Sequence, residues 1–373
     1  MPKVLIVFPV SEVGGGETVM LNLIRFRERP DLDYSALIVS DEDGPLTDSL
    51  TALSVPHIRI RRGRMRNPLS FIRATRAARR VIWRIRPDVV LTNSSQGFLY
   101  ARWAAGHRVP SALYFMSVPD EKRLSPLDAL ARGTPPDKVF AASNAIKDAL
   151  ERRGVRQVAT VYHGAPEPVA TSDGRQAVNR RLDELGVPQN ARIVLLPGRL
   201  QRWKGQLAFV RAFAPIATVF PDAHGVILGG ALFGQEEDFK AELEREIHRI
   251  NLDTRLHLAG HDVMAPWLER ASCVVHASIA PDAFPNVCIE ALAAHRPLIT
   301  NAECGVAEIL TAGSDAWVVP PRDVEALSAA IRDVLSDPAR AARTAESGYR
   351  QYAAHCTPSH MVGAIESELC ALS

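Results

Sequence analysis

The sequence predicts an α/β protein with two doubly wound, Rossmann-like domains that face a cleft. Near-continuous apolar runs such as "KVLIVFPV" (3–10) suit strands buried on both faces of a parallel sheet. They alternate with segments whose apolar residues recur at helical spacing. The alternation stops at the polar stretch "GAPEPVATSDGRQ" (164–176) and then resumes. Strands and helices alternating at these lengths form parallel sheets covered by helices, and a stretch rich in Pro, Gly, Ser and Asp is typical of a linker.

The expected elements follow from these patterns in chain order. In the first domain, a helix is expected from about Glu17, with Val19, Met20, Leu23 and Ile24 on one face, and another over 71–85. A long amphipathic helix is expected over Phe239–Ile250 in the second domain. We expect domains at 1–168 and 169–354, with a helix at about 355–373 packing back on the first. Strands are expected at 3–10, 34–40, 88–94, 111–117, 138–143, 192–198, 224–230, 255–260, 273–278, 297–300 and 316–320.

Composition narrows the functional classes. The chain has 373 residues and a net charge of only +2, which gives no bulk attraction to nucleic acid. Its five cysteines form no CxxC pair, so free, reduced thiols are expected. No stretch approaches the ~20 apolar residues of a membrane span. These features predict a cytoplasmic protein with no nucleic-acid partner.

The first glycine cluster is "EVGGGETVML" (12–21). A dinucleotide fingerprint would need a third glycine at Val19, which disfavours a dehydrogenase. Gly15 and Gly16 still allow the backbone to approach an anion at a helix N-terminus. The alternative is a tight strand-to-helix turn without a ligand.

The second cluster, "LLPGRLQRWKGQ" (195–206), follows a predicted strand. Arg199 and Lys204 would place two cations at the strand's carboxyl end, where they could anchor a diphosphate. Lys204 precedes Gly205, so the P-loop order is absent and an ATPase is disfavoured. A solvated basic turn is the alternative.

The stretch "PDAFPNVCIEALAAHRPLIT" (281–300) carries two acids, Asp282 and Glu290. Pro285 suits the first turn of a helix. The amides of Asn286, Val287 and Cys288 would then be free to bind a phosphate or a sugar hydroxyl. Asp282 lies before the helix and Glu290 inside it, so a two-metal clamp is not expected. The alternative makes Asp282 a helix cap and Glu290 a surface acid.

Other candidates carry weaker signals. "DED" (41–43) resembles a metal-diphosphate motif, although a solvated loop is the favoured interpretation. A structural role is expected for His163. The arginine-rich segment 59–87 would present a basic helix face, favoured as a solvated surface, with contact to anionic headgroups at the inner face of the membrane as the alternative.

Several motifs in order resemble glycosyltransferase family 4, whose members are retaining enzymes of the GT-B fold. The resemblance covers nearly the whole chain. It rests on "GGGE" (14–17), "KVFAASNAIKDAL" (138–150), "VYHGA" (161–165), "GRLQRWKG" (198–205), "PDAFPNVCIEALAAHRPLI" (281–299) and "VVPPRDVEALSAAIRDVLSDP" (318–338).

The resemblance implies a set of site residues. Arg199 and Lys204 would hold the donor diphosphate, and Glu290 the ribose hydroxyls. Asp282, with the backbone around Phe284, Pro285, Asn286 and Val287, would hold the donor sugar and phosphate. Asp282, Arg199 and Lys204 are the implied catalytic residues, and Gly15 and Gly16 the implied glycine loop on the donor.

This sequence departs from the family pattern at four places. Asp282 stands for a glutamate and Pro285 for a glycine. Met116 and Asn93 stand where histidines are common, and Met cannot exchange protons. Asn93, Ser94, Ser95 and Met116 are therefore the candidates on the acceptor side.

The function implied is retaining transfer from a nucleoside-diphosphate sugar to a glycan or lipid-linked acceptor, in polysaccharide or glycoconjugate biosynthesis. No metal and no cofactor are expected. Two alternatives remain: a catalytically silent nucleotide-sugar-binding protein, suggested by the missing histidine, and a nucleotide-sugar epimerase of similar fold.

Overall fold

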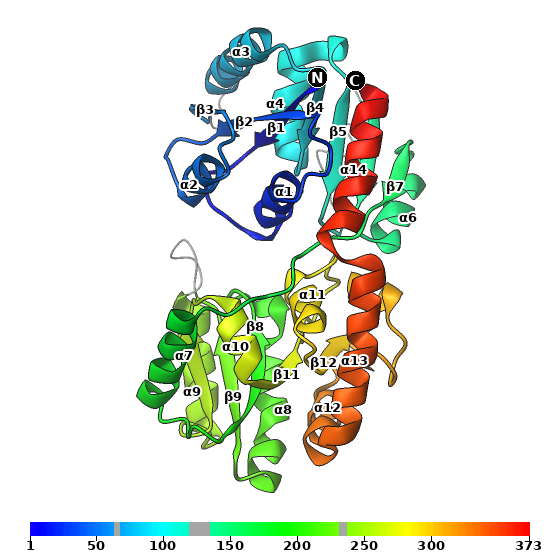
Figure 1. The fold of residues 1–373 in the computed structure, drawn as a ribbon. Helices are drawn as coiled ribbons and strands as arrows, with labels where there is room; N and C mark the ends of the chain where they lie inside the picture. Colours follow the sequence, from blue (N-terminus) through cyan, green and yellow to red (C-terminus); the bar gives the residue numbers. More distant parts are fainter. Residues whose placement is uncertain (63–67, 119–134, 231–236) are drawn as a thin grey trace. The chain divides into compact units, whose positions relative to one another are not determined.

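The structure is a computed structural model that describes residues 1–62, 68–118, 135–230 and 237–373 (Figure 1). The chain divides into two compact units. Unit 1 comprises Met1–Gly164 together with Cys356–Ser373, and unit 2 comprises Ala165–His355. Each is described by itself below.

Unit 1 contains a seven-stranded sheet in the order β3-β2-β1-β4-β5-β6-β7, and every neighbouring pair is parallel. Its elements are β1 (Lys3–Phe8), α1 (Gly15–Arg25), β2 (Asp33–Val39), α2 (Pro45–Ala52), β3 (His57–Ile60), α3 (Pro68–Ile85), β4 (Val89–Thr92), α4 (Ser95–Ala105), η1 (Gly106–Arg108), β5 (Ser111–Phe115), β6 (Lys138–Ala141), α6 (Asn144–Arg152), β7 (Val158–Thr160) and α14 (Pro358–Leu372).

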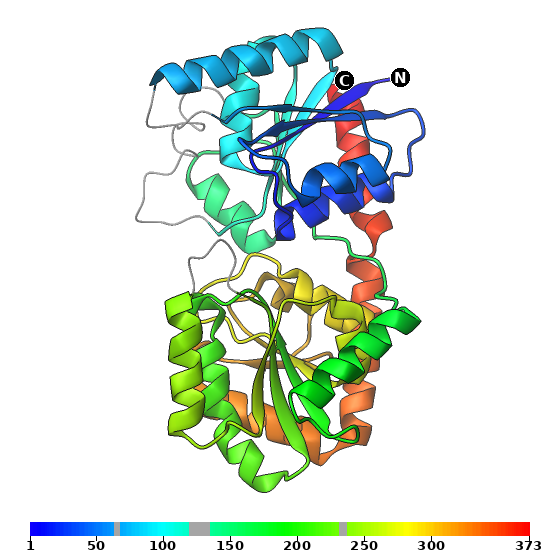
Figure 2. The same ribbon diagram turned by 90° about the vertical axis from the view of Figure 1, so that its left-hand side faces the viewer.

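Helices cover both faces of this sheet, which explains why its strands are apolar throughout. Leu5 and Val7 of β1 pack against α3 and α4. The alternate residues Val4, Ile6 and Phe8 are equally buried, and α1 and α2 lie on the side opposite α3 (Figure 2).

The helix α14 closes unit 1 through a buried carboxylate. Glu366 is fully buried. It accepts hydrogen bonds from the Tyr34 hydroxyl (2.9 Å) and from the backbone amides of Glu28 (3.1 Å) and Arg29 (2.9 Å). The helix α14 is thereby fixed to β2 and to the loop that precedes it.

Unit 2 contains a six-stranded parallel sheet in the order β10-β9-β8-β11-β12-β13. Its elements are α7 (Ser172–Glu184), β8 (Arg192–Pro197), η2 (Arg202–Lys204), α8 (Gln206–Val219), β9 (Ala223–Leu228), α9 (Glu237–Arg249), β10 (Leu256–Gly260), α10 (Met264–Arg270), β11 (Ala271–Val275), α11 (Asn286–Ala293), β12 (Leu298–Asn301), η3 (Gly305–Ile309), β13 (Trp317–Val319), α12 (Val324–Ser336) and α13 (Pro338–His355).

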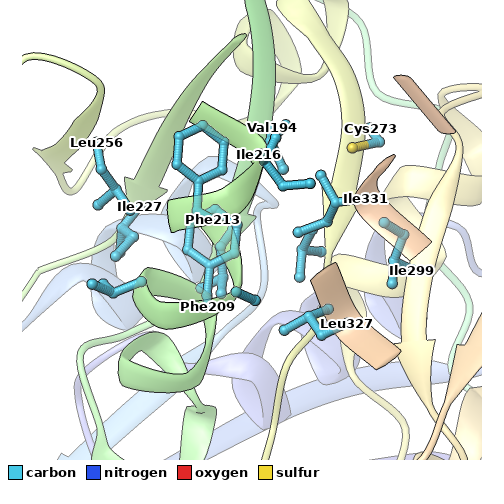
Figure 3. Packing of buried hydrophobic residues seen from close by; sticks show 14 of the residues in the cluster. Val194, Phe209, Phe213, Ile216, Ile227, Leu256, Cys273, Ile299, Leu327 and Ile331 are labelled. Carbon is cyan, nitrogen blue, oxygen red and sulfur yellow. The ribbon is translucent and has the colours of Figure 1, made fainter. Parts of the chain in front are cut away.

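The core of unit 2 forms where α8 and α12 pack on the sheet (Figure 3). Phe209 and Phe213 of α8 are fully buried there. Figure 3 shows them beside Ile227 and Leu256 of neighbouring strands. Leu327 and Ile331 of α12 belong to the same core cluster. This packing holds the ends of β8 and β11 in place.

Both sheets reverse their strand order at one point, between β1 and β4 in unit 1 and between β8 and β11 in unit 2. In doubly wound sheets the helices that follow the two strands at such a point pack on opposite faces, and ligands bind beside the loops that connect the strands to these helices. Gly14–Gly16 and Asn93 follow the strands at the first point, and Lys204 and Asp282 follow those at the second.

The expected hinge is shorter than predicted. Residues 164–176 were expected to form a linker, but α7 begins at Ser172 within it. The Thr171 hydroxyl accepts a hydrogen bond from the Gly174 amide (3.1 Å), so the polar residues cap a helix instead of breaking one. Two strands were not predicted, β3 and β7, which are the short edge strands of their sheet.

A buried histidine pair links β9 and β10 in unit 2. His224 Nδ1 lies 3.1 Å from His257 Nε2, and the rings stack. That hydrogen bond needs at least one of the two nitrogens unprotonated. Burial, with the neighbouring His224 and Arg255, lowers the pKa of His257 to about 4. Burial also lowers the pKa of His224.

We therefore expect His257 by itself to contribute a loss of about 3 kcal/mol in the free energy of unfolding as pH drops from about 6.5 to 4. In this window its imidazole is protonated in the unfolded chain and neutral in the folded chain. In urea titrations at stepped pH, His257→Gln should lack this loss relative to the wild type, whereas His261→Gln, at an exposed histidine, should follow the wild type. An unchanged slope in His257→Gln would contradict the assignment.

Among the described residues, no helix is long and apolar enough to cross a membrane.

Candidate functional site

The reversal point of unit 2 brings Lys204 and Asp282 into direct contact. Lys204 ends η2 after β8, and Asp282 follows β11. Lys204 Nζ donates to Asp282 Oδ2 at 2.6 Å, and their side chains are only 19% and 11% exposed. Two residues predicted from separate motifs thus form one charged pair at the carboxyl ends of adjacent strands.

His276 completes this pair and was missed by the sequence analysis. It is 3% exposed. Its Nε2 lies 3.0 Å from Asp282 Oδ2 and 2.9 Å from the Ser278 hydroxyl, and its Nδ1 lies 3.0 Å from the Thr300 hydroxyl. The available signal was a histidine directly after the apolar run of β11, at the edge where the site was expected.

The charges in this group support one another. Burial by itself would lower the pKa of His276, but Cys304 and Asp282 outweigh burial and raise it to about 9. Burial would likewise raise the pKa of Asp282, yet His276 and Lys204 hold it below its ordinary value. Asp282 is therefore an ionised carboxylate between two cationic partners, and not the helix cap of the alternative interpretation.

Gly205 sets the approach of the lysine to the aspartate. It adopts a left-handed conformation (φ 76°), and a Cβ built on it would lie 1.8 Å from the Ala277 carbonyl oxygen. Beside it, the Ile279 amide donates to the Trp203 carbonyl at 2.7 Å. The turn carrying Lys204 and the loop carrying Asp282 are therefore held together through their backbones.

The helix after Asp282 begins one residue later than predicted. Pro285 is its N-cap residue and Asn286 its first residue. The Cys288 amide donates to the Pro285 carbonyl at 3.1 Å, so the prediction that it is a free donor was wrong. Phe284 is 2% exposed and packs in the core. Asn286 and Val287 remain at the open start of the helix, where both are partly exposed.

Glu290 lies one turn into α11 and is partly buried. Burial raises the pKa of its carboxyl to about 7. Within the described residues, its carboxylate has neither an ion pair nor a hydrogen bond. Its partial burial excludes the alternative in which Glu290 is a solvated surface acid. A half-buried carboxylate with no partner among the described residues can accept hydrogen bonds from a ligand.

Arg199 occupies the turn after β8, but its side chain is exposed. Its backbone carbonyl accepts a hydrogen bond from Gln206 Nε2 at 2.7 Å. The described contacts do not join its guanidinium to Lys204 or Asp282.

The reversal point of unit 1 gathers most of the remaining candidates. Asn93 Nδ2 donates to Glu17 Oε1 at 2.8 Å. A Cβ built on Gly16 would lie 3.4 Å from Asn93 Nδ2 and 3.5 Å from the Met116 Cε. Gly15 is the first residue of α1. Ser94 caps α4 by accepting from the Gly97 amide (3.0 Å), and Ser95 is the first residue of that helix.

The weaker candidates have structural surroundings. Residues 41–43 are exposed, and the Arg59 guanidinium donates to Asp43 at 2.6 Å. His163 is buried with its ring edge-on to Tyr114, the centroids 5.5 Å apart. The cysteines are free thiols, as expected, and four of the five are buried.

Two family models match the chain and together span most of it. A glycosyl transferase 4-like domain matches residues 14–198, and a glycosyl transferases group 1 domain matches residues 179–351.

Curated relatives match over part of their length. A D-inositol 3-phosphate glycosyltransferase of Streptomyces avermitilis is 28% identical over 226 residues, which are 57% of this chain and 47% of that protein. A glycogen synthase of Mycobacterium tuberculosis is 34% identical over 156 residues, which are 41% of this chain and 36% of that protein. The chain thus spans half or less of the length of these two relatives.

Solved structures resemble the chain along its whole length. Anabaena Alr3699/HepE, in complex with UDP and glucose, has a TM-score of 0.84 at 21% identity, with all of both chains covered. A glycosyltransferase from Rickettsia africae has a TM-score of 0.84 at 19% identity, covering all of this chain and 98% of the other. These likenesses confirm the predicted GT-B fold.

Proposed function

Because the chain belongs to the glycosyltransferases that pair a 4-like domain with a group 1 domain, we propose that it transfers a sugar from a nucleoside-diphosphate sugar to an acceptor. The observation that carries the proposal is the constellation at the reversal point of unit 2. There a buried lysine–aspartate pair lies on the same edge of the sheet as the start of α11. One turn into that helix, the carboxylate of Glu290 has no partner among the residues that the structure describes.

Each group has a chemical task in this proposal. Lys204 and Arg199 hold the diphosphate and stabilise the charge that develops on it as the glycosidic bond breaks. Asp282, with the backbone at Phe284, Pro285, Asn286 and Val287, orients the donor sugar and phosphate. Glu290 accepts hydrogen bonds from the ribose hydroxyls. Gly15 and Gly16 form the close-approach loop on the donor.

The transfer proposed is retaining and uses no metal ion on the diphosphate and no cofactor. Lys204 is already desolvated beside Asp282, so its charge is screened little by water. The acceptor is a glycan or a lipid-linked glycan intermediate. Asn93, Met116 and the start of α4 at Ser94 and Ser95 are its candidate contacts, in polysaccharide or glycoconjugate biosynthesis.

A donor panel tests the function. Two structural relatives were solved with UDP and with UDP-glucose, so UDP-sugars come first, followed by GDP-, ADP- and dTDP-sugars. Calorimetry identifies the donor, and chromatography of the sugars after incubation with and without a glycan acceptor gives the reaction. We expect donor binding and acceptor-dependent transfer. Binding without turnover would instead indicate the silent binder, and a changed donor sugar without acceptor the epimerase.

Glu290 gives a sharper test of the donor site. Glu290→Gln keeps the shape of the side chain but replaces the charged carboxylate, which accepts hydrogen bonds, with a neutral amide. The affinity for the nucleotide sugar should therefore fall by about 10- to 100-fold, which corresponds to the loss of one charged hydrogen bond. The wild type should discriminate against a 2′-deoxyribose donor, and the variant should lose that discrimination. Glu325→Gln, at an exposed position of α12, serves as the control. Discrimination that survives in Glu290→Gln would remove Glu290 from the ribose.

We further propose peripheral contact with anionic lipid through α3, within the predicted segment 59–87, of which 63–67 lie outside the described residues. Arg73, Arg76, Arg79, Arg80 and Arg84 are exposed on α3, which has no acidic residue. Leu69, Ile72 and Trp83 are also exposed, and so is Trp103 of the neighbouring α4, its ring against Phe71. Exposed arginines with interleaved apolar side chains are typical of helices that lie on a membrane.

Vesicle flotation tests this contact at the cytoplasmic ionic strength. The protein should float with phosphatidylglycerol vesicles and not with phosphatidylcholine vesicles. Arg76→Glu with Arg80→Glu should abolish flotation, while Arg180→Glu, on the exposed face of α7, should not. Equal flotation with both lipids, or with neither, would contradict the proposal.

A further inference from the structure

Three metal-ligating side chains gather behind Asp282 in unit 2. His276 follows β11, Cys288 lies in the first turn of α11, and Cys304 precedes η3. One ligand atom from each lies within 4.8 Å of the other two. The three residues are 3%, 0% and 3% exposed. Among the described residues, this is the group of His, Cys, Asp or Glu side chains that comes close enough to share an ion.

The orientation of the His276 ring suits a metal ligand. Its Nε2 faces the Asp282 carboxylate at 3.0 Å, and its Nδ1 faces the Thr300 hydroxyl at 3.0 Å. The same hydroxyl oxygen lies 3.9 Å from Cys288 Sγ, so Nδ1 and the Cys288 thiol share Thr300 as a neighbour. When the His276 imidazolium gives up its Nδ1 proton to a metal, the proton left on Nε2 still donates to Asp282 and the Nδ1 lone pair is free for the ion. Metal-ligating histidines are held in this way by a carboxylate.

The ligand chemistry selects the kind of ion. Two sulfurs and one imidazole nitrogen suit zinc, which takes four ligands in a tetrahedron. Ligand atoms around one zinc ion lie about 3.3–3.8 Å apart, so shifts of about 1 Å close the cluster. Two thiolates, a neutral imidazole and Zn²⁺ sum to zero charge, which suits a buried position. Binding releases to solvent the protons that the two thiols still hold and one proton of the His276 imidazolium.

We propose that His276, Cys288 and Cys304 form a zinc-binding site, with a water molecule or the Thr300 hydroxyl as fourth ligand and Asp282 as the outer partner of His276. The ion would sit behind Asp282 and away from the position proposed for the diphosphate. The inference does not rest on the proposed transfer reaction, since zinc binding can be measured on the protein alone.

The site would rigidify the segments that hold Asp282. The Asp282 amide donates to the Glu303 carbonyl (3.2 Å), and the Gly305 amide donates to the Asp282 carbonyl (2.9 Å). Cys304 lies between these two bonds and pairs with Asp282 in a β-bridge. An ion that ties Cys304 to His276 and Cys288 therefore fixes the backbone of Asp282 as well as its side chain.

Cobalt titration of the full chain tests the proposal. Reduced protein freed of metal by a chelator is titrated with Co²⁺, which reports thiolate ligation by charge-transfer absorption and tetrahedral geometry by visible bands. We expect one equivalent to bind, and Zn²⁺ to displace it and raise the melting temperature. If the wild type gives no thiolate–cobalt band, the site does not exist, and this outcome needs no variant.

Variants then assign the ligands. Cys304→Ser and Cys288→Ser should each abolish the thiolate–cobalt band, and Asp282→Asn should weaken zinc by about 10- to 100-fold, as loss of a carboxylate partner does elsewhere. Cys370→Ser, at the partly exposed cysteine of α14, should bind cobalt as the wild type does. A band that persists in folded Cys304→Ser, or that vanishes in Cys370→Ser, would place the metal elsewhere and overturn the assignment.

Discussion

Lys204→Ala is expected to lower kcat/KM for transfer by about 10²–10³-fold, the usual effect of removing one preorganised group that stabilises transition-state charge. The ammonium lies 2.6 Å from Asp282 and the Lys204 side chain is only 19% exposed, so water cannot replace it as it would at an exposed site. Initial rates at varied donor concentration measure the loss. The melting temperature should change little, because His276 and Ser278 still contact the Asp282 carboxylate.

The contact between the two residues gives a second measurement. Since they share one hydrogen bond, Lys204→Ala and Asp282→Asn should be strongly non-additive, and the double variant should be about as slow as the slower single variant. Lys240→Ala, at an exposed lysine of α9, is the matched control and should transfer normally. Independent, multiplying losses would show that the pair does not act as a unit.

Gly205→Ala is expected to destabilise unit 2 by more than about 3 kcal/mol and to stop transfer. Its Cβ would lie 1.8 Å from the Ala277 oxygen and 2.6 Å from the Ala277 carbon. Both are backbone atoms, so one loop must move, and moving it separates Lys204 from Asp282. The left-handed conformation alone costs about 1–2 kcal/mol for alanine.

Gly313→Ala separates these two costs. Gly313 has nearly the same φ of 78°, but a Cβ there meets nothing within 4 Å. In guanidinium unfolding, Gly313→Ala should therefore show only the cost of the left-handed conformation, and the variant should keep full activity. If Gly205→Ala were no more destabilised than Gly313→Ala, the close approach of the two loops would be wrong.

The strands of both sheets could be predicted well from the sequence because burial on both faces demands unbroken apolar runs. The edge strands β3 and β7 were not predicted. An edge strand is less buried, so its sequence mixes polar and apolar residues and forms no unbroken apolar run. The linker was predicted too long for a related reason. Polar residues that are unfavourable inside a helix are favourable at its N-cap, and Thr171 caps α7 in this way.

Site residues could be predicted only where a single sequence motif indicated their chemical role. Lys204 and Asp282 were each recognised, but their contact spans 78 positions of sequence and depends on the strand order. The position of His276 directly after an apolar run was a signal, but its contact with Asp282 depends on how residues 277–281 return the chain to the histidine, which the sequence pattern does not reveal. The role of the Cys288 amide could not be predicted either, since it depends on whether Pro285 lies inside the helix or caps it.

Unit 1 is assembled from two separated stretches of chain, with all of unit 2 between them. During synthesis the first 164 residues therefore emerge without the helix whose Glu366 binds the Tyr34 hydroxyl and the amides of Glu28 and Arg29. Unit 2, which is continuous, can complete its fold earlier, since domains fold as units while the chain emerges. Until Glu366 emerges, the Tyr34 hydroxyl and the amides of Glu28 and Arg29 therefore lack the buried carboxylate that they bind in the completed unit.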